Sequence, residues 1–202
     1  MNLETAFTMD TSSIKFGKGV TREIGSDFKN MGVKRFMICT DNRVAKLSTM
    51  EVVEASLKEV GLEYEIYSGV SVEPTDVSFL EAIDFAKKGK FDGYLGVGGG
   101  SSMDTVKAAN LYATYPPEDF LDYVNPPIGK GKPVPGSIKP MICIPTTAGT
   151  GSETTGVAIF DLLSMEAKTG IAHRSLRPLM GIIDPDNTKS LPKMVTACTA
   201  LD

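Results

Sequence analysis

The chain has 202 residues, of which 42% are hydrophobic and 23% are charged, a composition typical of a soluble globular protein with a sizeable buried core. The formal net charge is −4 and charges of both signs are mixed along the chain, so no basic block or stripe indicates a nucleic-acid partner. No apolar run approaches the roughly 18 residues of a membrane span, which predicts that no segment crosses a membrane.

Strand-like and helix-like segments alternate from residue 33 onward. The expected strands are 33–40, 63–70 and 91–100, and the expected helices are 48–61, 77–90 and 101–115. Gly61 is a typical helix terminator, and Lys87 and Lys88 suit the negative end of a helix. This βαβ alternation predicts an α/β fold in which a parallel sheet carries helices on both faces.

The second half of the chain has a less regular pattern. Residues 115–136 are rich in Pro and Gly and are expected to form an ordered excursion between elements. Residues 139–161 return to a strand, pass through a loop of Thr, Gly and Ser, and end in another strand. In a parallel sheet, ligands bind beyond the carboxyl ends of the strands, where the strand order reverses. Asp41 and the glycines that end the third expected strand should therefore lie together at this edge.

The three cysteines, Cys39, Cys143 and Cys198, are far apart, odd in number and surrounded by apolar residues. They are expected to be reduced core thiols in a reducing compartment. The first ten residues show neither the apolar core of a signal peptide nor the arginines of a transit peptide. A cytoplasmic location is therefore expected, or a mitochondrial one if the protein comes from a eukaryote.

A turn of three glycines, Gly98 to Gly100, separates the third expected strand from the helix that follows it. Without Cβ atoms, the backbone N–H groups can approach an anion, which the positive end of the helix also favours. Ser101 or Ser102 is expected to cap the helix and to donate a hydroxyl to a phosphate oxygen. The stretch departs from the dinucleotide fingerprint, since Met103 replaces its third glycine. A phosphate-binding turn and a plain tight turn both remain open.

A second loop, 145–153, supplies the hydroxyl groups of Thr146, Thr147, Thr150 and Ser152 next to glycines. Such a loop is a typical neighbour for a phosphate, a ribose or a carboxamide. The alternative is a surface loop that its own Ser and Thr turns stabilise. On spacing alone, both interpretations stand.

Asp41 follows the first expected strand and could accept hydrogen bonds from the ribose of an adenine nucleotide. Its carboxylate would repel a 2′-phosphate, which predicts a preference for NAD over NADP. The alternative is an Asp that caps a turn. Lys107 is expected to form a solvated or structural pair with Asp104, with contact to the cofactor side as the alternative, and the single histidine, His173, is expected at the surface. No catalytic residue is assigned.

Two stretches together, "GGGSSMDTVKAAN" and "PTTAGTGSETT", resemble the signature loops of the iron-containing (group III) alcohol dehydrogenase family. The joint match is specific, although neither half is. Three further stretches, 72–113, 119–134 and 149–161, are similar to the branch of this family that passes a hydride from a hydroxyacid to an oxoacid. The likeness runs along nearly the whole chain.

The resemblance implies an N-terminal Rossmann-type domain that binds NAD, followed by an all-helical domain, with iron or zinc between the two. It assigns Asp41 to the adenosine ribose and the glycine turn to the pyrophosphate. The full set of residues expected at the cofactor is Asp41, Gly99, Gly100, Ser101, Ser102, Asp104, Thr146, Thr147, Thr150 and Lys168. Within this set, the three threonines would line the nicotinamide side, with Lys168 nearby.

The metal site is where the sequence departs from the family. "MVTACTALD" matches the start of the metal-binding helix, so Asp202 falls on an aspartate ligand, but the three histidine ligands are absent and His173 matches none of them. One aspartate cannot hold a catalytic metal, which needs three or more protein ligands. We therefore expect residues 1–185 to be the NAD-binding domain and 186–202 to be the start of the helical domain. Alone, the 202-residue chain is expected to be inactive.

For the complete enzyme, the resemblance implies hydride transfer through NAD from a hydroxyacid, such as 4-hydroxybutyrate, to an oxoacid, such as 2-oxoglutarate. One alternative is an NAD-dependent alcohol dehydrogenase of the iron type that acts on small primary alcohols. Another is a non-catalytic module that binds a nucleotide. A small-molecule substrate and a homo-oligomer, such as a dimer, are the expected partners.

Overall fold

The computed structural model describes residues 11–202, which form a central sheet covered by helices. The strands are β1 (Ser13–Phe16), β2 (Arg35–Cys39), β3 (Glu63–Tyr67), β4 (Gly93–Gly98), β5 (Met141–Pro145), β6 (Val157–Leu162), β7 (Ala167–Ala172) and β8 (Met180–Ile183). The α-helices are α1 (Ile24–Asn30), α2 (Ser48–Glu59), α3 (Asp76–Gly89), α4 (Gly100–Thr114) and α5 (Lys193–Ala200).

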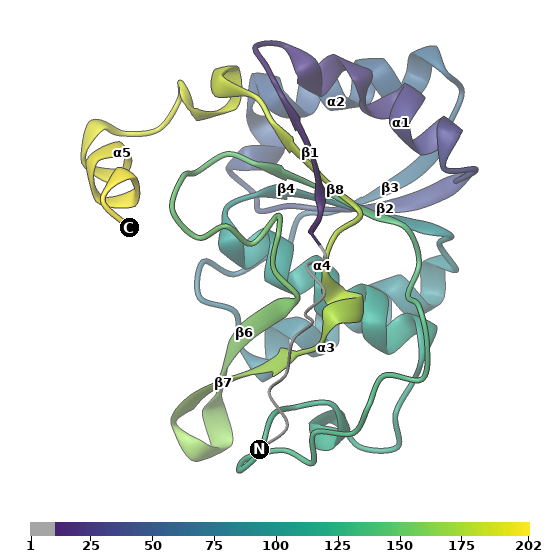
Figure 1. Cartoon of the computed structure of the whole chain (residues 1–202), viewed down its shortest axis with the longest axis vertical. Helices are drawn as coiled ribbons and strands as arrows, with labels where there is room; N and C mark the ends of the chain where they lie inside the picture. Colours follow the sequence, from purple (N-terminus) through teal and green to yellow (C-terminus); the bar gives the residue numbers. More distant parts are fainter. Residues whose placement is uncertain (1–10) are drawn as a thin grey trace, which may run out of the picture.

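Six of these strands form one sheet in the order β1-β8-β5-β4-β2-β3, and every neighbouring pair is parallel. Helices α1 and α2 cover one face of the sheet, and α3 and α4 cover the other (Figure 1). The expected α/β fold, with a parallel sheet between two layers of helices, is thus confirmed. The three strands and three helices expected between residues 33 and 115 are all present, with ends that differ by a few residues, and β5 and β6 are the two strands expected within 139–161.

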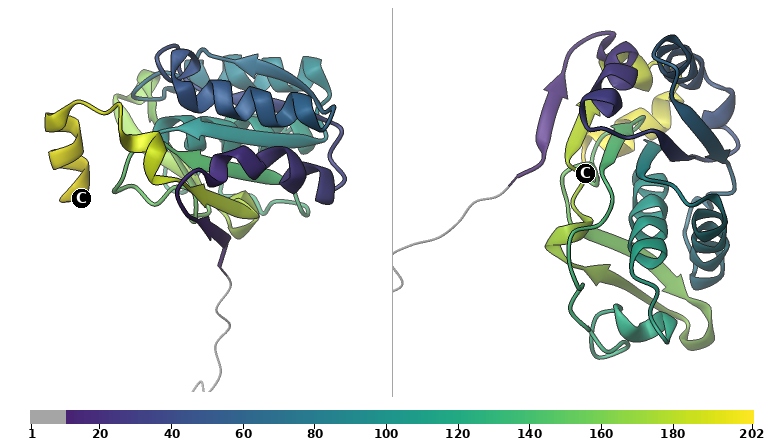
Figure 2. Two further views of the ribbon diagram at one scale, coloured as in Figure 1. Left: turned by 90° about the horizontal axis from the view of Figure 1, so that it is seen from above. Right: turned by 90° about the vertical axis from the view of Figure 1, so that its right-hand side faces the viewer.

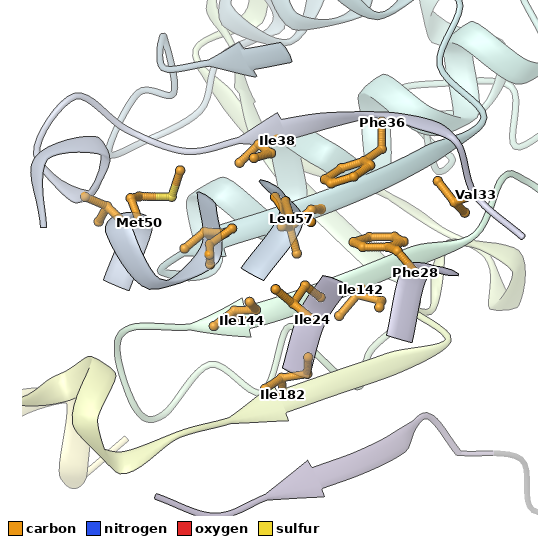
Figure 3. Close-up of a cluster of buried hydrophobic side chains, with 14 residues drawn as sticks. Ile24, Phe28, Val33, Phe36, Ile38, Met50, Leu57, Ile142, Ile144 and Ile182 are labelled. Atoms are coloured by element: carbon orange, nitrogen blue, oxygen red, sulfur yellow. The ribbon is translucent and has the colours of Figure 1, made fainter. Parts of the chain in front are cut away.

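The α1–α2 face is held by an apolar cluster of helix and strand side chains, which Figure 3 shows in close-up. The rings of Phe28 on α1 and Phe36 on β2 stack with their centroids 4.5 Å apart. Leu57 on α2 and Ile142 on β5 are completely buried in the same cluster. Burial of each such side chain contributes about 1.5–3 kcal/mol, which fixes both helices against the strands.

The opposite face depends on a small residue in the central strand. Gly96 on β4 lies in register between Cys39 on β2 and Cys143 on β5. A Cβ atom at Gly96 would lie 2.9 Å from Cγ1 of Val106, so the glycine lets α4 pack closely against the sheet. Both cysteines are buried there, as expected, but Cys198 is exposed on α5, and the expectation of a core thiol is wrong at that position.

A second, smaller layer lies beyond α3 and α4. The antiparallel pair β6–β7 stands apart from the main sheet, and the excursion after α4 packs near it (Figures 1 and 2). Phe160 on β6 packs against Phe79 on α3 and Phe120 of the excursion, with ring centroids 5.2 and 5.4 Å apart. The excursion is ordered, as expected. Strands β1, β7 and β8 were not anticipated from the sequence, nor was the pairing of β6 with β7.

The strand order reverses between β2 and β4. From β2 the chain passes through α2 to the edge strand β3, and from β4 it passes through α4 toward β5, on the other side. The loops after β2 and β4 therefore leave toward opposite faces of the sheet and open a crevice between them.

Two expectations concern residues 1–10: the first ten residues of the expected NAD-binding domain, and the lack of a signal or transit peptide. Both lie outside the described residues. Between residues 11 and 202, no helix has the length and apolar character needed to cross a membrane.

Candidate functional site

The site begins at the crevice between β2 and β4, where the loops after these strands come together. Gly98 has a backbone φ of +147°, and a Cβ atom there would lie 2.4 Å from the Ser102 Oγ and 3.8 Å from the Asp41 Oδ2. A side chain is therefore excluded by the backbone conformation and by the packing. The expected meeting of Asp41 with the glycine turn is confirmed by this geometry.

The glycine turn leads directly into α4, whose N-cap is Gly99, and no side chain caps the helix. The expected cap by Ser101 or Ser102 is therefore wrong: the Ser101 hydroxyl donates to the Val72 carbonyl, and Ser102 is buried beside Gly98. No hydrogen bond is found for the N–H groups of Gly100 and Ser101 within the described chain. These are unpaired donors of a helix N-terminus, which favour an anion.

The loop after β5 packs directly on the glycine turn. The Thr146 N–H donates to the Gly98 carbonyl at 2.9 Å. A Cβ atom at Gly99 would lie 3.3 Å from the Thr147 Oγ1, and one at Gly100 would lie 3.1 Å from the Thr150 Cγ2. The close packing of the two loops therefore explains the lack of side chains at both positions, whether or not a ligand binds there.

A first cavity of about 550 Å³ opens at this crevice. Its lining includes Asp41, Gly99, Gly100, Ser101, Ser102, Thr146 and Thr147 from the expected set, together with Arg43, Val44, Leu47, Val70, Ser71, Val72, Ser190, Leu191, Pro192 and Val195. Hydroxyl groups and backbone line one part, and aliphatic side chains line the rest. Such a mixture suits a ligand with an apolar ring and polar linking groups.

A second cavity, of about 420 Å³, shares Val72, Gly100 and Ser101 with the first. It contains the other three residues of the expected set, Asp104, Thr150 and Lys168. The fold therefore divides the ten residues between two adjoining cavities that meet at the start of α4. A single extended ligand that passes over Gly100 and Ser101 would contact both.

Asp41 does two things at the first cavity. Its Oδ1 accepts hydrogen bonds from the N–H groups of Arg43 at 2.7 Å and Val44 at 3.0 Å, which forms a capped turn after β2. The turn that the sequence left open as an alternative is therefore present. Asp41 also lines the cavity, so the carboxylate is both fixed by the turn and exposed to a ligand.

Asp104 differs, because its carboxylate is engaged within the protein. Oδ2 accepts from the Ile159 N–H at 3.1 Å, and Oδ1 accepts from the Ser152 hydroxyl at 3.3 Å and lies 3.6 Å from the Lys107 Nζ. The side chain of Lys107 is 0% exposed, and its Nζ donates to the Val157 carbonyl at 2.8 Å. The structural pair expected from the sequence is confirmed. It connects α4 to β6 and to the loop before it.

Burial determines the protonation behaviour of this pair. It raises the pKa of the Asp104 carboxyl above its usual value, which the charge of Lys107 and the hydrogen bonds from Ile159 and Ser152 oppose. Burial likewise lowers the pKa of the Lys107 ammonium, against the attraction of Asp104. Each charge is therefore costly on its own and depends on its partner.

Lys168 and His173 differ in their relation to the site, since Lys168 lines the second cavity and His173 does not. Lys168, on β7, is largely exposed, pairs with Asp161 at 3.2 Å and is one of the residues that line the second cavity. His173 caps a short turn, where its Nδ1 accepts from the Ser175 N–H at 3.1 Å. It lines a different cavity, next to the start of β5 and β8, so it belongs to neither part of this site.

Asp202, the expected metal ligand, is exposed and lies after α5, next to the loop that follows β5 (Figure 1). A Cβ atom at Gly149 would lie 2.9 Å from the Asp202 Oδ2. Among residues 11–202, no group of three or more His, Cys, Asp or Glu side chains could hold a metal ion. The described residues therefore do not complete a metal site, and no step is derived through a metal.

Sequence reasoning missed Arg43 and the aliphatic lining of the first cavity. The signal was present: "DNRVAKL" places a cation and apolar residues directly after Asp41. A further part of the lining lies about 150 residues away in the chain and consists of Ser190, Leu191, Pro192 and Val195. Only the fold shows that this segment closes the same cavity.

A parallel sheet whose strand order reverses at a glycine turn, with a cavity at that point, defines a Rossmann-type α/β domain. Residues 11–185 match the family model of the iron-containing alcohol dehydrogenases. The chain belongs to this family.

Relatives of the chain agree with that assignment. The mitochondrial hydroxyacid-oxoacid transhydrogenase of Mus musculus is 54% identical over 197 residues, which make up 98% of this chain and 42% of the relative. The NADH-dependent butanol dehydrogenase A of Thermotoga maritima is 30% identical with a TM-score of 0.88, over 98% of this chain and 48% of that one. The sulfoacetaldehyde reductase of Bifidobacterium kashiwanohense, solved in complex with NAD+, is 28% identical with a TM-score of 0.86, over 98% of this chain and 51% of that one. The chain thus spans about half the length of its relatives or less.

Proposed function

We propose that the chain binds NAD across the two cavities that meet at the start of α4. One observation carries this proposal: the crevice at the reversal of strand order brings a carboxylate, two unpaired backbone N–H groups and a loop rich in hydroxyls together around one cavity. Each part suits a different group of a dinucleotide. A neighbour of similar fold was solved with NAD+, which supports the same choice of ligand.

In this proposal, different residues contact different parts of the cofactor. Asp41 accepts from the adenosine ribose, and the aliphatic lining takes the adenine. The N–H groups of Gly100 and Ser101 bind the pyrophosphate, with Gly99, Ser102, Thr146 and Thr147 around it. Thr150 and Lys168 face the nicotinamide side, in the second cavity. Asp104 supports that side through Ser152 and β6, because both its oxygens are already engaged.

We further propose that the protein is an oxidoreductase that passes a hydride from a hydroxyacid, such as 4-hydroxybutyrate, to an oxoacid, such as 2-oxoglutarate. When bound, NAD supplies the atom that accepts and returns the hydride. The described residues hold and orient that cofactor, with residues 1–185 as its domain and 186–202 as the start of a helical one. The 54% identity to a transhydrogenase over nearly the whole chain supports this substrate class.

Several further expectations stay part of the proposal. A homo-oligomer is expected for the whole protein. A mitochondrial location is favoured over a cytoplasmic one, since the similar transhydrogenases carry that location in their names. Iron is the metal that the family name implies, and Asp202 is the described residue that the resemblance assigns to it.

A dehydrogenase that exchanges its cofactor freely is the second candidate, favoured by the likeness to a butanol dehydrogenase. One assay separates the candidates. The whole protein, not the 202-residue chain alone, is incubated with iron, 4-hydroxybutyrate and 2-oxoglutarate, with and without added NAD. Turnover of both acids without added NAD supports the transhydrogenase, and NADH that accumulates only with added NAD supports the dehydrogenase. NADH binding without turnover is the result expected of a chain that acts as a nucleotide-binding module alone.

Binding itself is tested by calorimetry with NADH on the 202-residue chain. We expect one site per chain. Absence of any heat of binding, in a chain that circular dichroism shows to be folded, would contradict the proposal.

A further inference from the structure

The charge of the first cavity depends on two side chains. In the part of the chain that the structure describes, Asp41 and Arg43 are the charged residues among those that line it, and the others are aliphatic, hydroxyl or glycine residues. The formal charge of the lining is therefore zero, and either residue alone would give it a sign.

The two side chains are held differently. The Asp41 carboxylate is fixed, since its Oδ1 accepts from the N–H groups of Arg43 and Val44. The backbone of Arg43 is held by the same bond, but its side chain is exposed and its guanidinium makes no hydrogen bond or ion pair within residues 11–202. Arg43 thus offers an unused cation at a fixed point of the turn.

We infer that Arg43 is a specificity-determining residue, a ready contact for a 2′-phosphate that Asp41 keeps out of the cavity. This inference rests on the proposed binding of NAD. The ribose of a bound dinucleotide would lie at Asp41, and the 2′-phosphate of NADP would lie beside that carboxylate, where like charges repel. A guanidinium within the same turn matches the planar donor geometry that phosphate oxygens prefer.

The arrangement has a consequence for coenzyme choice. Removal of the Asp41 charge alone should convert the cavity into one that accepts NADP, because the cation needed for the phosphate is already in place. Without Arg43, the same change should remove the repulsion and gain little attraction. The preference therefore depends on the pair, and Arg43 decides how far it can shift.

The test compares the unchanged chain with Asp41→Asn, Asp41→Asn/Arg43→Ala and Asp41→Asn/Lys46→Ala, each titrated with NADH and with NADPH in a calorimeter. Asn keeps an acceptor oxygen for the two N–H groups of the turn. Lys46 is the matched control, an exposed cation of the same turn, in the short helix Val44–Lys46, that does not line the cavity. Thermal unfolding shows whether each variant is folded.

We expect Asp41→Asn to raise the affinity for NADPH relative to NADH by about tenfold or more. Arg43→Ala in that background should reverse about fivefold or more of this gain, and Lys46→Ala less than about twofold, with NADH affinity alike in both. Equal NADPH affinities in the two double variants would overturn the inference, as would the lack of a gain in Asp41→Asn. If the unchanged chain binds neither dinucleotide, the proposed function fails and the inference with it.

Discussion

The two cavities that meet at Gly100 and Ser101 differ in what their carboxylates do. In the first cavity, Asp41 gives one oxygen to a local turn and still faces the cavity. In the second, Asp104 gives both oxygens to Ser152, Ile159 and Lys107 inside the protein. Asp41 follows the end of β2, Asp104 lies near the start of α4, and both belong to the set expected at the cofactor. The difference shows that the surrounding chain determines which carboxylate stays available to a ligand.

The contrast extends to the cations beside them. Arg43 is exposed and has no partner among the described residues, whereas the side chain of Lys107 is completely buried. The first cavity therefore keeps a charged side chain available to a ligand, whereas the Asp104–Lys107 pair holds α4 against β6. Three changes test this division and a fourth tests Asp122, a carboxylate outside both cavities; they follow in order of decreasing effect.

Lys107→Met should have the largest effect, since it leaves the Asp104 carboxylate buried without a partner charge. We expect the free energy of unfolding to fall by about 3–5 kcal/mol at neutral pH. Urea unfolding measures this loss. Lys58→Met is the control, because it removes an exposed pair with Glu54 and should cost less than about 0.5 kcal/mol. Similar losses in the two variants would mean that the buried pair has no special structural role.

The double variant Asp104→Asn/Lys107→Met should be more stable than Lys107→Met alone. The amide oxygen keeps an acceptor for Ile159 or Ser152, and no buried charge remains without a partner. We expect about 1–3 kcal/mol of the loss to be recovered in a double-mutant cycle. Strict additivity of the two single losses would show that the groups act independently.

Gly100→Val tests the junction of the two cavities. A branched side chain there would meet Thr150 and the ligand path at the start of α4. We expect NADH affinity to fall about tenfold or more, equal to about 1.4 kcal/mol. Ala148→Val is the control, because Ala148 is exposed in the loop after β5 that also contains Thr150. It should leave the NADH affinity within about twofold.

NADH titration together with thermal unfolding of Gly100→Val separates two causes of that loss of affinity. If Gly100→Val lowers NADH affinity without a fall in melting temperature, the side chain obstructs the ligand. A matching fall in melting temperature instead means that crowding of Thr150 displaces the loop. Unchanged affinity would contradict the placement of the pyrophosphate.

The change at Asp122 should have the smallest effect on stability. The pKa of this carboxyl is lowered in the folded chain, whereas that of Asp104 is raised. Hydrogen bonds from Lys130 and Lys132 lower the pKa of Asp122 to about 2, although burial opposes them. Because the folded pKa lies below the unfolded value of about 3.9, the carboxylate stabilises the fold above about pH 4, and this contribution is lost as the pH falls toward 2. The free energy of unfolding should therefore decline less between pH 4 and 2 in Asp122→Asn than in the unchanged chain. Parallel curves would contradict the assignment.

Much of the fold could be predicted from the chain alone, because periodicity reports which backbone conformation buries the apolar residues. The alternation from residue 33 to residue 115 identified three strands, three helices and the glycine turn between β4 and α4. The reversal of strand order then brought Asp41 to that turn. By contrast, β1 and β8 were not predicted, since each is a four-residue strand that depends on pairing with strands distant in the chain.

What only the tertiary structure decided is the partner of each polar group. The sequence could not show that Ser101 bonds to Val72 instead of capping α4, because its acceptor comes from a loop 29 residues earlier. Nor could it show that Asp104 accepts a hydrogen bond from β6 while Arg43 has no side-chain partner within residues 11–202. Local pattern determines the conformation of a segment, but hydrogen bonds and burial between distant segments determine which side chains remain available to a ligand.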